Sequence, residues 1–212
     1  MTNKFRKHTI KRSCDKKYKD YHSYKQYLKV DFRNRCAYCN MHDTWIMPLP
    51  FQIDHFIPRT KFEGAKRNDL DNDYRNLMYS CPVCNRLKSD AFDGEIPEDK
   101  ISNPYFYNPV DIDYNTIFNR DEMGRIQSED ELGRDMMKRL QLYRPTKQMA
   151  WFLDELTQVY DEIERRMQIE ENPEKKRKLE CSYNKIGNVL FRRQRFFVHS
   201  FMNEKTTRNK KA

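Results

Sequence analysis

Apolar positions change their spacing along the chain, from short runs in the first half to helical repeats in the second. Residues 48–58, "PLPFQIDHFIP", and residues 76–81, "NLMYSC", each predict a short strand, the first bounded by prolines. Residues 82–90, "PVCNRLKSD", predict a helix with a proline near its first turn. A helix capped by Ser23 is expected to run to about residue 33. The pattern therefore predicts an α+β fold for this part of the chain.

The remaining segments are expected to be loops, one hairpin and long helices. Residues 61–76 are rich in Asn and Asp, and residues 91–110 contain three prolines, so both are predicted loops. A β-hairpin should turn near Met123-Gly124. Apolar residues predict helices over residues 132–142 and 148–171. Pro173 is expected to open a last helix, which ends around "RRQRFFVHSF". We expect a loosely ordered basic arm (1–22), a central domain (23–110) and a hairpin plus helical C-terminal region (111–212) that binds a partner or nucleic acid.

Charge is concentrated at the two ends of the 212-residue chain, whose net charge is +9. Residues 1–29 carry +8 and residues 185–212 carry +7, which leaves −6 for the middle. Basic arms on a slightly acidic body suit a protein that meets a polyanion, although basic ends are also found as solvated tails. The basic N-terminus is not followed by an apolar segment, and no apolar run is long enough for a membrane helix. We therefore expect a cytoplasmic protein.

Two C-x-x-C pairs predict a structural zinc site. The four thiols of these pairs belong to Cys36, Cys39, Cys81 and Cys84. Four thiolates fill a tetrahedral zinc ion and leave no position for a substrate. Four buried thiols without metal are the alternative, which two identical short spacings disfavour. His42 is an alternative ligand, whereas Cys14 and Cys181 have no partner at ligand spacing.

Between the pairs lies the chain's one Asp-His dipeptide, Asp54-His55. A neutral imidazole can take a proton from water near neutral pH. A carboxylate can hold a hard cation such as Mg²⁺, and the amide oxygen of Asn85 could be a further ligand. Such a group of residues suits the hydrolysis of a phosphodiester, in which a cation stabilises the leaving oxygen.

The series "RCAYC…QIDHFIPR…YRNLMYSCPVCNRLKSD" closely resembles the His-Asn-His (HNH) endonuclease family, in the variant with Asn as the third motif residue. The resemblance implies a ββα-metal core stapled by the two Cys-x-x-Cys knuckles. It implies His55 as the catalytic general base, and Asn76 as the second catalytic-motif residue, which fixes the loop that holds the base. It implies Asp54 and Asn85 as ligands of a catalytic Mg²⁺ or Mn²⁺, and Lys88 as a basic residue that contacts nucleic acid.

The same resemblance implies DNA as the substrate, with 5′-phosphate and 3′-hydroxyl products. Arg59 could steer a phosphate, and Arg192, Arg193 and Arg195 alternate with Phe in a pattern that suits a nucleic-acid surface. The C-terminal region is similar to that of antiphage HNH nucleases, including the Septu type, which work beside an ATPase subunit. A zinc module that binds nucleic acid or a partner without catalysis is the alternative, as is a defence subunit that is silent alone.

Overall fold

The computed structural model describes residues 4–46 and 49–206, so the first three and last six residues of the two basic ends lie outside the described residues. The chain forms two compact units, Met1–Arg144 and Pro145–Ala212. The predicted C-terminal region 111–212 is therefore divided between the two units. Within the described residues, no helix is long and apolar enough to cross a membrane.

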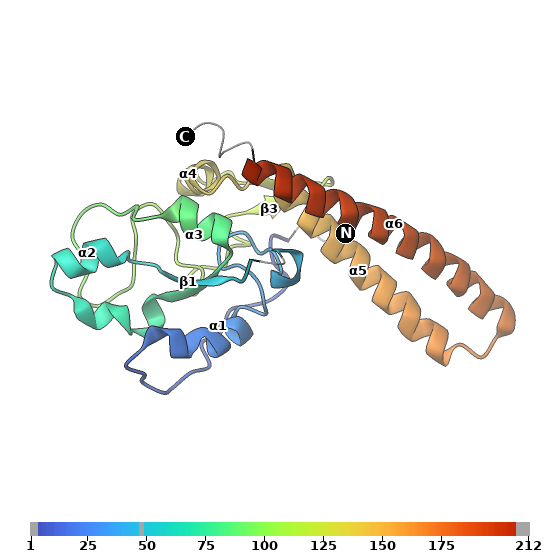
Figure 1. Cartoon of the computed structure of the whole chain (residues 1–212), viewed down its shortest axis with the longest axis horizontal. Coiled ribbons are helices and arrows are strands. Elements are labelled where there is room, and N and C mark those ends of the chain that lie inside the picture. The colour runs from blue at the N-terminus through green and yellow to red at the C-terminus, as the bar shows by residue number, and fades with distance from the viewer. Residues whose placement is uncertain (1–3, 47–48, 207–212) are drawn as a thin grey trace. The chain divides into compact units, whose positions relative to one another are not determined.

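The central feature of the first unit is a two-stranded antiparallel sheet with a helix beside it (Figure 1). Strand β1 (Gln52–His55) pairs with β2 (Leu77–Ser80), with Gln52 opposite Ser80 and His55 opposite Leu77. Helix α3 (Pro82–Lys88) starts after Cys81, and Pro82 lies in its first turn, where its missing N–H would have no partner anyway. The α+β fold and both predicted strands are confirmed.

The polar segment between the two strands is not the loop that its composition predicted. It contains α2 (Arg59–Gly64) and two 3-10 helices, η3 (Asn68–Asp71) and η4 (Tyr74–Asn76). Phe62 and Leu70 are both 1% exposed and pack with other apolar residues of the first unit. Burial of these widely spaced apolar side chains stabilises the helical structure of the segment. Its Asn and Asp content therefore wrongly predicted a loop.

The N-terminal arm is also more ordered than its charge predicted. Phe5 is 1% exposed and its ring lies 5.8 Å from that of Tyr114 and 5.2 Å from that of Phe118. Arg6 is 4% exposed and donates a 2.7 Å hydrogen bond to the carbonyl of Ala37, and its burial lowers its pKa to about 10. The arm is thus part of the hydrophobic core. It leads into η1 (Tyr21–Tyr24) and α1 (Lys25–Asp31).

The predicted hairpin belongs to the first unit. Strands β3 (Asn119–Arg120) and β4 (Ile126–Gln127) pair in antiparallel fashion, and Gly124 in the turn has a φ of 78°, which glycine adopts without strain. Helix α4 (Glu131–Arg139) follows and is capped by the side chain of Asp130, which accepts a hydrogen bond from the N–H of Gly133.

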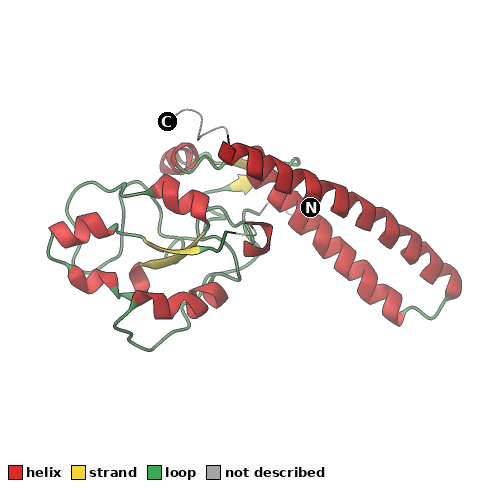
Figure 2. Ribbon diagram, in the orientation of Figure 1, coloured by secondary structure: helices red, strands yellow, loops and turns green. Residues whose placement is uncertain are grey.

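The second unit is a helical hairpin. Helices α5 (Pro145–Ile169) and α6 (Pro173–Thr206) lie side by side and are joined by a short loop (Figures 1 and 2). The rings of Tyr160 and Tyr183 stack across them at 4.1 Å, and the hydroxyl of Tyr183 donates to Glu164. Both helices were predicted, α5 from its apolar spacing and α6 as a helix opened by Pro173.

Phe5→Ala should lower the free energy of unfolding of the first unit by about 3–5 kcal/mol, because it leaves a cavity beside two buried rings. Urea unfolding of the full chain, followed by tyrosine fluorescence and circular dichroism, measures this change. Val30→Ala is the control, since Val30 is 65% exposed. An unchanged unfolding curve for Phe5→Ala would mean that the arm is as loose as its sequence suggested.

Candidate active site and metal centre

The four cysteines of the two C-x-x-C pairs meet at one point in the first unit. Their sulfur atoms all lie within 4.8 Å of one another, and each residue is at most 2% exposed. The Sγ atoms of Cys39 and Cys81 are 3.8 Å apart. Four sulfurs at about 2.3 Å from a central zinc ion would be spaced by about 3.8 Å. The cluster is therefore positioned to bind one zinc ion.

The chemistry of the cluster also fits zinc. Burial raises the pKa of the Cys36 thiol well above its usual range, so a bound cation is needed to make it a thiolate. With four protein ligands, a zinc ion there has no open position, and its role is structural. His42, the alternative ligand, instead contacts the hydroxyl of Thr44 at 2.9 Å and is not among the clustered ligands.

The first knuckle connects the cluster to the strand pair. The N–H of Ala37 donates a 2.8 Å hydrogen bond to the carbonyl of Tyr79 on β2. The next residue, Tyr38, is fully buried, and its hydroxyl donates to Oδ2 of Asp54 on β1. The zinc knuckle therefore fixes one oxygen of the Asp54 carboxylate directly.

His55 is held in one tautomer by a backbone carbonyl. Its Nε2 lies 2.9 Å from the carbonyl oxygen of Asp71, at the end of η3. Because a carbonyl oxygen can only accept, Nε2 must carry the proton in this hydrogen bond. Nδ1 then has a free lone pair, and no described residue hydrogen-bonds to it. His55 is thus arranged to accept a proton at Nδ1.

The surroundings of His55 favour its neutral form. Burial lowers the pKa of His55, and this effect outweighs the nearby carbonyl and carboxylate of Asp71, which act in the opposite direction. The Oδ1 atom of Asp71 lies 3.3 Å from His55 Nε2 and 3.1 Å from Arg59 Nε, within ion-pair distance of both. It makes a hydrogen bond to neither nitrogen. The ring of Tyr21 meets the imidazole edge-on at 4.8 Å. A neutral imidazole is the form that a general base needs.

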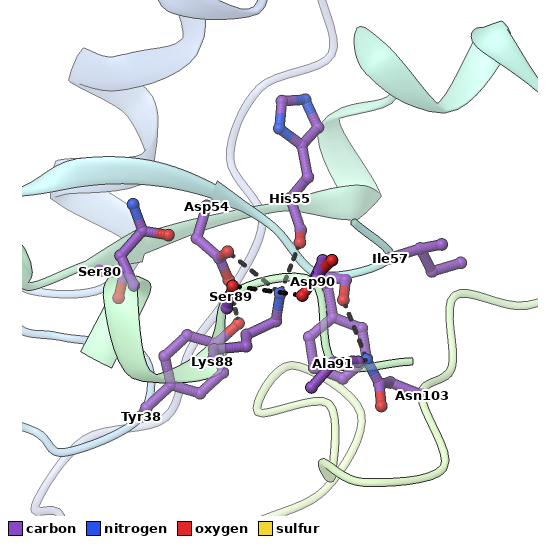
Figure 3. A network of polar contacts seen from close by, with 12 residues as sticks. Tyr38, Asp54, His55, Ile57, Ser80, Lys88, Ser89, Asp90, Ala91 and Asn103 are labelled. Atoms are coloured by element: carbon purple, nitrogen blue, oxygen red, sulfur yellow. Dashed lines mark hydrogen bonds and ion pairs between the residues drawn. The ribbon is translucent and has the colours of Figure 1, made fainter. Parts of the chain in front are cut away.

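Asp54 lies on the opposite face of β1 from the His55 ring (Figure 3). This arrangement follows from the alternation of side chains along a strand. Asp54 is 5% exposed, and its carboxylate is held by the hydroxyl of Tyr38 and by the ammonium of Lys88, whose Nζ is 3.1 Å from Oδ1. The Lys88 Nζ also donates a 2.7 Å hydrogen bond to the carbonyl of His55. Lys88 is 0% exposed, so it is not at a surface where it could contact nucleic acid.

Asn76 connects the residues that follow β1 to the segment whose carbonyl holds His55. Its side chain is fully buried, accepts from the N–H of Ile57 at 2.8 Å and donates to the carbonyl of Leu70 at 3.1 Å. Leu70 precedes Asp71, whose carbonyl accepts the proton of His55 Nε2. The Asn76 amide therefore joins the backbone two residues after His55 to the backbone one residue before Asp71.

Asn85 and Asp54 offer the oxygen ligands that Mg²⁺ and Mn²⁺ prefer. Asn85 lies on α3 and donates a 2.7 Å hydrogen bond to Oε1 of Gln52, which leaves its own amide oxygen outside that bond. Gln52 and Asp54 share a face of β1, so Asn85 faces the side of the strand that carries the carboxylate. The donor chemistry fits a hard divalent cation, although Lys88 occupies one side of the carboxylate.

The predicted nucleic-acid residues other than Lys88 are accessible. The side chain of Arg59 is 49% exposed, although its Nε is paired with Asp71. Arg192, Arg193 and Arg195 are exposed on α6, beside Phe191, which is 62% exposed. These arginines are accessible to nucleic acid, and their role in binding it stays a prediction.

Residues 36–91 match the model of the HNH endonuclease family. This match covers both knuckles, β1, β2 and α3, which together form the geometry described above. The segment is an HNH endonuclease domain. HNH endonucleases are phosphodiester hydrolases. No match to the chain was found among curated proteins or among solved structures.

Three residues of the site were missed by the sequence analysis. Tyr38 lies inside a zinc knuckle, Asp71 acts through its backbone carbonyl, and Tyr21 comes from outside the matched segment. Only Tyr38 had a local signal, since its place between two cysteines fixes its orientation toward β1. The backbone of Asp71 and the ring of Tyr21 reach His55 only through the tertiary fold.

Cys81→Ser should abolish zinc binding and unfold the HNH segment, because zinc binding and folding are coupled in a four-thiolate site. Zinc per chain, measured by mass spectrometry, should fall from one to none, with a lower melting temperature. Cys181→Ser is the matched control, since Cys181 is exposed on α6. A zinc-free Cys81→Ser chain with unchanged melting would show that the cluster is not structural.

Proposed function

We propose that the chain is a metal-dependent endonuclease that hydrolyses DNA phosphodiester bonds at the His55 site. The observation that carries this proposal is the hydrogen bond from Nε2 to the Asp71 carbonyl, which leaves Nδ1 as a base. The match of residues 36–91 to the HNH endonuclease family supports the same chemistry. DNA is the proposed substrate.

In the proposed reaction, Nδ1 of His55 takes a proton from a water molecule, whose oxygen attacks the phosphorus atom. The Asp71 carbonyl stabilises the resulting imidazolium by keeping the Nε2–H bond. Asn76 keeps η3, which ends at Asp71, in place during this transfer. The bond between phosphorus and the 3′ oxygen breaks, and this oxygen takes a proton from solvent water, so the products carry 5′-phosphate and 3′-hydroxyl ends.

Asp54 and Asn85 are the proposed ligands of the catalytic Mg²⁺ or Mn²⁺. When bound, such an ion supplies positive charge for the pentavalent phosphorus and for the leaving oxygen. The support for these ligands is their donor chemistry and their placement on facing elements, β1 and α3.

We further propose that the nuclease acts in bacterial antiphage defence beside an ATPase subunit. The helical hairpin of α5 and α6 supports a docking role, because it exposes Phe191, Phe196 and Val198. The exposed arginines of α6 are proposed to contact nucleic acid. Co-purification of the tagged chain with the product of a neighbouring gene tests the partnership, and an ATPase is the expected product.

His55→Ala should lower the rate of DNA cleavage by about 100-fold or more, because it removes the base. A plasmid-nicking assay with Mg²⁺ and EDTA arms measures the rate, with zinc content and melting temperature as checks on folding. His199→Ala is the matched control, since His199 is exposed on α6. Cleavage by His55→Ala at the wild-type rate with saturating Mg²⁺ would rule out the proposed base. A wild-type chain that is inactive alone is assayed together with its co-purifying partner.

Asn76→Asp should reduce kcat by roughly 10- to 100-fold while KM changes little, because the carboxylate cannot donate to the Leu70 carbonyl and the imidazole loses its alignment. Asn68→Asp makes the same change at an exposed residue of η3 and should leave kcat unaltered. Steady-state kinetics on a labelled duplex separates kcat from KM. Equal kcat values for the two variants would remove Asn76 from the mechanism.

A further inference from the structure

A buried ion pair lies between β1 and α3, beside the proposed catalytic centre. The Lys88 ammonium and the Asp54 carboxylate are 3.1 Å apart, and the two residues are 0% and 5% exposed (Figure 3). Lysine is rarely buried so completely unless it has an ionic partner. Lys88 therefore cannot be an ordinary solvated surface charge, and its burial beside Asp54 suggests a specific role.

The position of Lys88 is fixed by three features. Its Nζ donates to Asp54 Oδ1 and to the carbonyl of His55, which are both at the end of β1. It is the last residue of α3, and the following residue, Ser89, has a φ of 49°, a conformation that favours glycine. The chain thus accepts an unusual backbone conformation directly after the residue whose side chain enters the site.

Lys88 and the proposed divalent cation would use the same carboxylate. Asn85, the other proposed ligand, lies three residues before Lys88, and such a spacing places both side chains on one face of α3. The second oxygen of Asp54 already accepts the hydroxyl of Tyr38. A divalent ion on Asp54 would therefore lie close to a buried ammonium, and like charges repel strongly where water is excluded.

We propose that Lys88 is a resident counter-cation of Asp54 that holds the carboxylate and the His55 backbone in the ion-free enzyme and weakens the binding of the divalent ion. This inference rests on the proposed function, since it takes Asp54 as a ligand of that ion. Lys88 is then a positioning residue, and the divalent ion binds in competition with its ammonium.

The test is the affinity of the zinc-loaded full chain for Mn²⁺, measured by isothermal titration calorimetry. Lys88→Gln removes the charge but keeps a donor for the His55 carbonyl. It should lower the Kd for Mn²⁺ by at least about tenfold. Arg86→Gln removes a positive charge from the exposed side of the same helix and should change the Kd less than about twofold, because water screens that charge. An unchanged or higher Kd for Lys88→Gln would overturn the proposal.

Two further measurements separate the possible failures. Adding Asp54→Asn to Lys88→Gln should abolish the gain in affinity, and a retained gain would place the ion elsewhere and contradict the proposal. If Lys88→Gln is unfolded without ions, Mn²⁺ should refold it, since the ion replaces the missing counter-charge. A variant that stays unfolded in saturating Mn²⁺ would contradict the counter-cation role. Absence of Mn²⁺ binding by both the wild type and Lys88→Gln would instead refute the proposed metal centre itself.

Discussion

The nuclease site depends on the four buried thiols that join the two ends of the HNH segment. Cys36 and Cys39 form one knuckle, and Cys81 and Cys84 form the other at the start of α3. The first knuckle carries Tyr38, whose hydroxyl holds Asp54. The second begins the helix that carries the proposed ligand Asn85. Loss of the clamp would therefore disturb the Asp54 face of β1 through both knuckles at once. A structural ion among the thiols would in this way support a site that it does not contact.

At the end of β1, the side chains of His55 and Asp54 lie on opposite faces of the strand. On one face, His55 is fixed by the Asp71 carbonyl, which is in turn fixed through Asn76. On the other face, Asp54 is held between a phenol and an ammonium. Buried polar groups are stable only when they are satisfied, so these contacts give the site a single geometry. The imidazole and the carboxylate are thus fixed by different side-chain contacts, and Lys88 links the two through the His55 backbone carbonyl.

Local patterns predicted the parts of this site that depend on spacing. The cysteine pairs, both strands and α3 were predicted, since a knuckle or a short strand is determined by neighbouring residues. The buried position of Lys88 was missed, because lysine is usually exposed and its partner lies 34 positions earlier in the sequence. The ordered arm was missed for the same reason, since Phe5 becomes buried only against Tyr114 and Phe118. Long-range burial is not visible in the spacing of residues along the chain.

The most direct test of the two-ion arrangement is anomalous diffraction from a crystal of the zinc-loaded protein soaked in Mn²⁺, recorded at the zinc and manganese edges. The account predicts a zinc peak among the four cysteine sulfurs and a manganese peak in contact with Asp54 and Asn85, with the Lys88 ammonium shifted away from the carboxylate. A manganese-free site with Lys88 still bound to Asp54 in saturating Mn²⁺ would contradict it.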